Sequence, residues 1–428
     1  MPSRAHGQQS KAARNVAALR AVGLTGSFFL VMLAYYQVKP ASRSLFLEHL
    51  SAQALPYLWI ASALMIGLLM PLYQRCIQKI PRVQLVVSSI VLSQAGLVWF
   101  WYQLDSAGPV TAVAFAIFTD IMSVVLVEQV WSLANSSFVL AEGRRWYGLV
   151  ASGGLLGGMV SGGLGSVLLS RFDLPTSDLL MVAVLILVVL AVVTIVFSRV
   201  GLFVERQGYR ALPVGSMHSF KQMLAQPYLL GIAGILLTAQ LIAPVIEYQF
   251  LSIVEVNYPD RDPRTAYLAG FFALLSACAL ATNLVVVPVI LRQFGTLGGL
   301  LVQPLLVLLS SLAFMVVSSL PVAALMKISD RGLSYSINRV SRELLYVPVD
   351  GELIYKAKAW IDMFGYRLFR ILGSLLIKIC TVWLPWSLEL EELSWITVVT
   401  VALWVYLIAR IAQTRLGRLA NYNRAAPA

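Results

Sequence analysis

The sequence is poor in charge, in cysteine and in histidine. Only 12% of its 428 residues are charged, whereas soluble domains carry about 25%. The spacing of Cys76, Cys278 and Cys380, which lie apart in apolar stretches, indicates neither a disulfide framework nor a zinc site. The 3 histidines are isolated as well. These shortages argue against a disulfide-stapled domain, and we expect no metal site, no catalytic residues and no cofactor.

Recognisable enzyme motifs are also lacking. The glycine-rich run from Ser152 to Gly165 follows no soluble strand and precedes no Gly-Lys-Ser/Thr, so it is not a phosphate-binding loop. The polar stretch from Met1 to Arg20 lacks the small-residue cleavage site of a signal peptide. We therefore predict that the protein is neither an enzyme nor an ATP-driven pump.

Long apolar stretches dominate what is present. Hydrophobic residues make up 59% of the chain, and about 20 apolar residues are enough for one helix to cross a membrane. Twelve such stretches can be placed, at residues 19–45, 54–75, 83–104, 109–138, 146–170, 177–199, 226–255, 264–291, 295–318, 320–347, 354–384 and 394–414. They predict an all-α polytopic membrane protein of the major facilitator type, with about twelve transmembrane helices in two six-helix bundles.

One long connection, from Arg199 to Lys221, divides the chain into two groups of six stretches. We expect five regions along the chain. They are a cytoplasmic N-terminal tail (1–18), an N-terminal bundle (19–199), a central cytoplasmic loop (200–225), a C-terminal bundle (226–414) and a cytoplasmic C-terminal tail (415–428).

Basic residues predict which side of the membrane each loop occupies. With the N-terminus in the cytoplasm, cytoplasmic segments hold 20 lysines and arginines, and the outer loops hold 3, namely Arg171, Arg261 and Arg264. Cytoplasmic loops of membrane proteins carry such an excess of positive charge. We therefore predict cytoplasmic termini and a multi-pass protein of the bacterial inner membrane. The net charge of +12 reflects this bias, so we expect no nucleic-acid partner.

Ionisable side chains inside the apolar stretches carry the functional information. A charge facing lipid near the bilayer centre costs about 2.5–3.5 kcal/mol, so these groups must face water or one another. An excess of cations in a polar cavity favours an anionic solute, and phosphate suits Arg and Lys best. The basic residues are Lys39, Arg43, Lys327, Arg331, Arg339, Arg342, Arg367, Arg370 and Lys378, and the acidic residues are Asp120, Glu128, Glu247, Asp330, Glu343 and Asp362.

Helical spacing selects candidates among these residues. On a regular helix, one stripe of the tenth span holds Lys327, Arg331, Ser334, Asn338 and Arg342. We predict that the solute is contacted by Lys39, Arg43, Asn135, Lys327, Arg331, Tyr335, Asn338, Arg367 and Arg370.

Carboxylates have other predicted roles. A desolvated carboxylate in a helical bundle can carry a proton, so Glu128 and Glu247 are predicted coupling groups; a satisfied polar contact is the alternative. Glu343 and Asp362 are predicted members of structural ion pairs, and Asp362 can pair with Arg367 or Arg370. Charged groups near helix ends can instead extend toward the membrane surface, as Arg339, Arg342, Glu343 and Lys378 can.

The glycine-rich run has two interpretations. Its small residues recur at four-residue spacing, with Gly153 and Gly157 followed by Ser161 and Gly165, so one helix face is smooth. Such a face allows either sliding between helices or close static packing.

Four groups of residues carry a resemblance to a known family. They are Glu343–Asp350 with Tyr355–Asp362, Tyr366, Arg367 and Arg370; Ser123–Leu126 with Trp131, Asn135 and Arg144–Gly148; Lys39 with Arg43; and Val245–Glu247 with Tyr258–Asp260. These stretches resemble the ATP:ADP antiporter family within the major facilitator superfamily. This resemblance implies an exchanger of nucleotide-like anions. Two regions differ from the family pattern, because Pro40 and Ser44 lie where acidic residues are usual and Leu251 lies where a lysine is common, which predicts a divergent branch with an altered cargo.

Together these patterns favour a secondary active transporter that moves a small anionic, nucleotide-like solute by alternating access. A proton-coupled exporter of a metabolite, chelator or drug is the first alternative, with protons as coupling ion. A non-transporting membrane scaffold or sensor is the second. We expect the solute and the lipid bilayer as partners, and a monomer.

Overall fold

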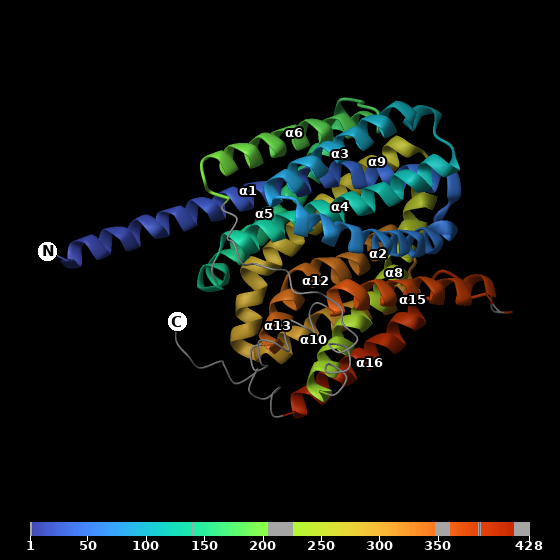
Figure 1. The fold of residues 1–428 in the computed structure, drawn as a ribbon. Helices are drawn as coiled ribbons and strands as arrows, with labels where there is room; N and C mark the ends of the chain where they lie inside the picture. Colours follow the sequence, from blue (N-terminus) through green and yellow to red (C-terminus); the bar gives the residue numbers. More distant parts are fainter. Residues whose placement is uncertain are drawn as a thin grey trace. The chain divides into compact units, whose positions relative to one another are not determined.

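The computed structural model describes residues 2–138, 140–203, 226–346, 360–383, 385 and 387–414. Within these ranges every regular element is a helix (Figure 1). Nine helical stretches of the described chain are long and apolar enough to cross a membrane. One of them, 261–316, has 56 residues and is long enough for two crossings, because each helical residue advances about 1.5 Å.

Helices of the N-terminal half begin and end close to the predicted spans. Two helices begin well before their predicted spans: α5 begins at Leu140 rather than 146, and α1 already begins at Pro2, inside the stretch predicted as a tail. Helix α1 ends before Ser51, which has a positive φ of 54°. The helices are α1 (Pro2–Leu50), α2 (Leu55–Lys79), α3 (Arg82–Gln103), α4 (Pro109–Ser137), α5 (Leu140–Arg171) and α6 (Asp178–Arg199).

The next three predicted spans also correspond to helices. These are α8 (Pro227–Asn257), α9 (Arg261–Ala281) and α10 (Val287–Val316), and a π-helical turn, η3 (Thr282–Val286), joins α9 to α10. A break interrupts α10 at Gly295, where φ is 70° and ψ is −171°. Glycine adopts this backbone conformation without a steric penalty. The break lies where the sequence predicts the end of one span and the start of the next.

The tenth span is not one regular helix. It consists of α11 (Leu320–Lys327), the π-helical turn η4 (Ile328–Gly332), the single turn α12 (Leu333–Tyr335) and α13 (Ile337–Tyr346). Ser336, with φ −113° and ψ −100°, separates α12 from α13. A regular rotation of 100° per residue therefore does not hold from residue 328 to residue 336, and the stripe predicted for a straight helix is wrong across this segment.

The last two spans are described in part. The eleventh contains η5 (Ile361–Gly365), α15 (Tyr366–Lys378) and η6 (Ile379–Trp383), and the twelfth is α16 (Ser394–Gln413). The predicted C-terminal tail (415–428) lies outside the described residues, as does most of the predicted central loop (204–225).

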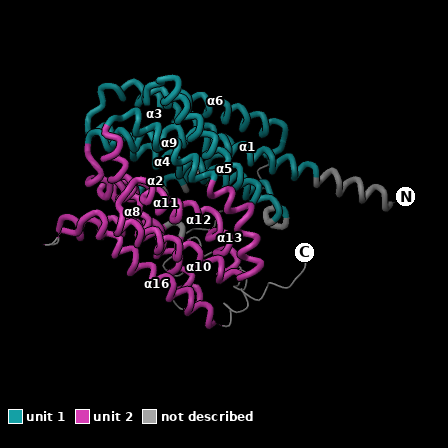
Figure 2. Tube along the Cα trace, turned by 180° about the vertical axis from the view of Figure 1, so that it is seen from behind, with its two compact units in different colours: residues 1–49, 68–210, 260–277 teal, residues 50–67, 211–259, 278–428 magenta. Residues whose placement is uncertain are grey.

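The chain forms two compact units (Figure 2). Unit 1 combines residues 1–49 and 68–210 with residues 260–277, so the first part of α9 packs with the N-terminal helices. Unit 2 combines residues 50–67 with 211–259 and 278–428. Inside unit 1, α3 packs along α6; inside unit 2, α8 packs against α15 and α16. The five regions expected from the sequence stay a prediction.

The glycine-rich run of α5 packs closely against two helices of unit 1. A Cβ atom on Gly157 would lie 2.3 Å from the carbonyl oxygen of Phe29 on α1. A Cβ atom on Gly162 would lie 2.3 Å from the carbonyl oxygen of Ala269 on α9. Any side chain larger than hydrogen would push these backbones apart, so the run forms two contact faces rather than one.

Candidate functional site

A buried ion pair joins α1 to α4 inside unit 1. Arg43 lies one turn beyond Pro40, which interrupts the hydrogen bonding of α1 because proline has no N–H to donate. The Arg43 Nη2 atom donates to Asp120 Oδ1 at 2.8 Å, and the two side chains are 3% and 11% exposed. The predicted solute contact Arg43 therefore has a carboxylate partner. The sequence placed both residues inside the membrane but did not pair them.

Lys39 contacts three aromatic rings of unit 1. Its Nζ atom lies 4.4 Å from the ring centroid of Phe272 on α9, and 5.6 Å from the ring centroids of both Tyr35 and Tyr36. Phe272 and Tyr36 are buried, and Lys39 is half-buried. Aromatic faces attract a cation, and the attraction grows as water is excluded. The sequence predicted Lys39 as a solute contact but gave no signal for Phe272.

Two further predicted residues lie on α4. Asn135 is half-buried, and its Oδ1 atom accepts a hydrogen bond from the Tyr147 hydroxyl at 2.8 Å. Trp131, one turn earlier, lies edge-on to Phe28 and to Tyr147, with ring centroids 5.7 and 5.8 Å apart. The hydroxyl partner of Asn135 therefore belongs to an aromatic cluster. The side chain of Glu128, the first predicted coupling group, is exposed.

Unit 2 holds a second buried ion pair, between α8 and α11. Lys327 Nζ lies 2.5 Å from Glu247 Oε2, and the two side chains are 3% and 10% exposed. Lys327 is the last residue of α11 before the π-helical turn, and Glu247 follows Pro244 inside α8. The structure thus brings together a predicted solute contact and a predicted coupling group.

A polar network continues from this pair into the π-helical turn. Asp330 Oδ2 lies 3.4 Å from Arg331 Nε. Gln303 of α10 donates from Nε2 to the Asp330 carbonyl at 2.9 Å, and Asn338 donates in turn to Gln303 Oε1. Asp330, Gln303 and Asn338 are all buried. The sequence predicted Arg331 and Asn338 but missed Gln303, whose signal was a lone amide in an apolar span.

The remaining predicted residues lie in less buried positions of unit 2. Tyr335 is exposed at 42%. Arg367 and Arg370 are half-buried on α15, and Glu343 is exposed on α13. The side chain of Asp362 lies outside the described residues, so its predicted ion pair stays a prediction.

Charge pairing changes the electrostatics expected from the sequence. Three cations predicted to contact the solute, Arg43, Lys327 and Arg331, each have a carboxylate within 4.0 Å. An entering anion would meet them as neutral pairs and would compete with the carboxylate for each cation. Among the described residues, no cluster of three or more His, Cys, Asp or Glu side chains could hold a metal ion.

The fold is shared with solved transporters. The structure matches the crystal structure of the nucleoside transporter NupG (D323A mutant) with a TM-score of 0.64, over 92% of this chain and 99% of that chain, at 12% identity. It matches a bacterial homologue of the human lysosomal transporter Spinster, in an inward-facing and unoccupied conformation, with a TM-score of 0.55, over 96% and 99% of the two chains, at 12% identity. The predicted all-helical fold of the major facilitator type is confirmed.

The sequence of the chain matches the model of a known protein family. The family model described as "TLC ATP/ADP transporter" matches residues 78–323 and 315–414, which is most of the chain. The chain therefore belongs to the TLC ATP/ADP transporter family, a family of multi-pass membrane proteins, and the predicted resemblance is confirmed.

Curated relatives agree with this assignment. The chain is 23% identical to ADP,ATP carrier protein 1 of Chlamydia trachomatis over 292 residues, which cover 59% of this chain and 55% of the carrier. It is 18% identical to ADP,ATP carrier protein 3 of Rickettsia felis over 374 residues, which cover 76% and 74% of the two chains. The chain thus spans a little over half the length of the chlamydial carriers and about three quarters of the rickettsial one.

Proposed function

We propose that the protein is a secondary active transporter that moves a small anionic, nucleotide-like solute across the bacterial inner membrane by alternating access. Family membership and relatives named ADP,ATP carriers support the solute class. The observation that carries the proposal is the buried Lys327–Glu247 pair at the edge of a π-helical turn. Transporters commonly form solute and ion sites where a transmembrane helix is interrupted.

The ion pairs suggest how such a solute is bound. A phosphate that contacts Lys327 must replace the Glu247 carboxylate, because both anions need the same ammonium group. The released carboxylate then needs a proton or another partner, since an uncompensated buried charge is strongly unfavourable. Glu247 is accordingly our first choice of coupling group. Asp120 neutralises the charge of Arg43 in unit 1.

We also propose that both termini lie in the cytoplasm. The charge bias of the loops supports this orientation. Arg261, one of the few basic residues of the predicted outer loops, lies within 4.0 Å of carboxylate oxygens of Glu48, Asp105 and Asp262. Its charge is therefore locally compensated, which further lowers the free positive charge on the outer side.

Counterflow in proteoliposomes tests the proposed function. Vesicles loaded with unlabelled ADP should accumulate labelled ADP or ATP, and Lys327→Gln should abolish the accumulation. Arg410→Gln, on the exposed end of α16, is the matched control and should transport normally. Failure of every nucleotide, nucleoside phosphate and other organic anion to exchange would contradict the proposal. Uptake that instead requires a pH gradient would favour the proton-coupled alternative.

A further inference from the structure

Phe272 is the ring nearest to the Lys39 ammonium. The distance from Lys39 Nζ to its centroid is 4.4 Å, against 5.6 Å for each of the two tyrosines on α1. Phe272 also packs against the buried Tyr36, with ring centroids 5.5 Å apart. A lysine side chain is a flexible four-carbon stem, so a cation–π contact of this kind restricts where its charge lies.

Close packing of α9 on α5 fixes the position of the Phe272 backbone. A Cβ atom on Gly162 would lie 2.3 Å from the carbonyl oxygen of Ala269 and 2.6 Å from the amide nitrogen of Ala273. These two residues flank Phe272 on α9. No side chain separates the two helices there, so the ring projects from a backbone that cannot move closer to α5.

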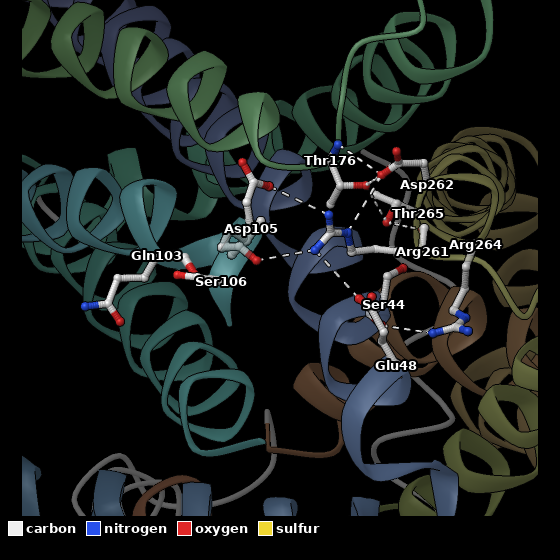
Figure 3. A network of polar contacts seen from close by, with 11 residues as sticks. Ser44, Glu48, Gln103, Asp105, Ser106, Thr176, Arg261, Asp262, Arg264 and Thr265 are labelled. Carbon is white, nitrogen blue, oxygen red and sulfur yellow. Dashed lines mark hydrogen bonds and ion pairs between the residues drawn. The ribbon is translucent and has the colours of Figure 1, made fainter. Parts of the chain in front are cut away.

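A polar network anchors the first turn of the same helix (Figure 3). The Asp262 Oδ1 atom accepts hydrogen bonds from the Thr176 backbone amide at 3.1 Å and from its hydroxyl at 2.5 Å. Arg264, only 2% exposed, donates from Nη1 to the carbonyl oxygen of Ser44 at 3.0 Å. Ser44 follows Arg43 on α1, so this bond ties α9 to the helix that carries Lys39.

We propose that Phe272 is a positioning residue for Lys39. Its ring, held by the anchored first part of α9, keeps the ammonium group in one orientation in which it meets a phosphate or carboxylate group of the solute. A group that is already ordered loses less entropy when it binds. The inference rests on the proposed function and deepens it. Phe272 of α9, an uncharged residue, would determine how tightly Lys39 of α1 binds an anion.

Transport kinetics with labelled ADP test this role. Phe272→Leu should raise KM about tenfold and leave kcat within about twofold, because a desolvated cation–π contact is worth on the order of one factor of ten in affinity. Phe272→Tyr keeps the ring and should restore a KM close to the wild-type value. Phe271→Leu is the matched control, since Phe271 is equally buried beside Phe272, and it should leave KM unchanged. Should Phe272→Leu fail to fold, Phe272→Met keeps the volume without the ring.

Coupling between the two residues separates positioning from packing. In a Lys39→Met background, Phe272→Leu should lower ADP affinity no further, as measured by the ADP-induced thermal shift. An equal loss with and without Lys39, or an unchanged KM in Phe272→Leu, would overturn the inference. If wild-type protein neither binds nor exchanges ADP, any other nucleotide or any other organic anion, the proposed function fails instead. The unfolding midpoints of wild type, Lys39→Met, Phe272→Leu and the double variant, measured without solute, then decide the inference. If the two substitutions lower the midpoint additively, Phe272 and Lys39 are not coupled and the inference is rejected.

Discussion

The two units hold their buried charges on different kinds of backbone. In unit 1 the Arg43–Asp120 pair joins α1 and α4, and neither helix contains a π-helical turn. In unit 2 the Lys327–Glu247 pair lies at the start of a π-helical turn. The side chains of the two pairs are almost equally buried, so burial does not distinguish them, whereas the π-helical turn does. We interpret the first pair as part of a fixed frame and the second as part of a segment that can rearrange, since π-helical turns are frequent at functional sites.

Removal of the Asp120 carboxylate should have the largest effect on stability. Asp120→Asn removes the carboxylate that lies 2.8 Å from the buried Arg43 guanidinium, between two helices that contain no π-helical turn. We expect a loss of about 4–5 kcal/mol, near the upper end for a broken buried pair. Denaturant or thermal unfolding of purified protein measures the loss, and Arg43→Met combined with Asp120→Asn should recover most of it. Wild-type stability in Asp120→Asn would contradict the role of the pair in the frame.

Glu247→Gln should reduce stability less than Asp120→Asn does, but should reduce transport more. Lys327 then loses the carboxylate 2.5 Å away, but the adjoining π-helical turn gives the backbone a way to adjust. We expect a loss of about 3 kcal/mol, near the lower end of the same range, together with loss of ADP exchange. The comparison with Asp120→Asn is the decisive measurement. Equal losses of stability in the two variants would mean that the π-helical turn does not help the backbone of unit 2 to adjust.

Helix positions could be predicted from the sequence because the signal is local. An apolar run of about 20 residues marks a span regardless of its neighbours, and α3, α4 and α6 end within one residue of the predicted limits. The break at Gly295 has a local cause in a residue that tolerates positive φ.

Partners within the candidate site could not be predicted in the same way. Arg43 and Asp120, or Lys39 and Phe272, meet only because distant helices pack together, and a single sequence contains no measure of that proximity. The irregular backbone from Ile328 to Ser336 could not be predicted either, because the segment contains no proline to mark a break. Its only glycine, Gly332, has ordinary helical angles and does not cause the irregularity. A stripe drawn on a straight helix therefore grouped Lys327 with Asn338, although their partners lie on α8 and α10.

The amide network of unit 2 should contribute a smaller amount than either ion pair. Gln303→Leu keeps a side chain of similar size but removes the donor to the Asp330 carbonyl and the acceptor of Asn338. Both groups are buried, so we expect a loss of about 1–3 kcal/mol from unsatisfied hydrogen bonds. Thermal unfolding measures it. Asn338→Leu combined with Gln303→Leu should cost no more than Gln303→Leu alone if the two amides act as one network.

Loss of the hydrogen bond between Tyr147 and Asn135 in unit 1 should have the smallest effect on stability. Tyr147→Phe removes the hydroxyl that donates to Asn135 at 2.8 Å and keeps the ring against Trp131 and Phe138. Asn135 is half-buried, so water can take the place of the hydroxyl, and we expect a loss of about 0.5–1 kcal/mol in unfolding experiments. If Asn135 selects the solute, Tyr147→Phe should nevertheless change the ratio of KM values for ADP and for inorganic phosphate, because the free amide can turn. If neither Tyr147→Phe nor Asn135→Ala changes this ratio of KM values, Asn135 does not contact the solute and serves only the packing of α4.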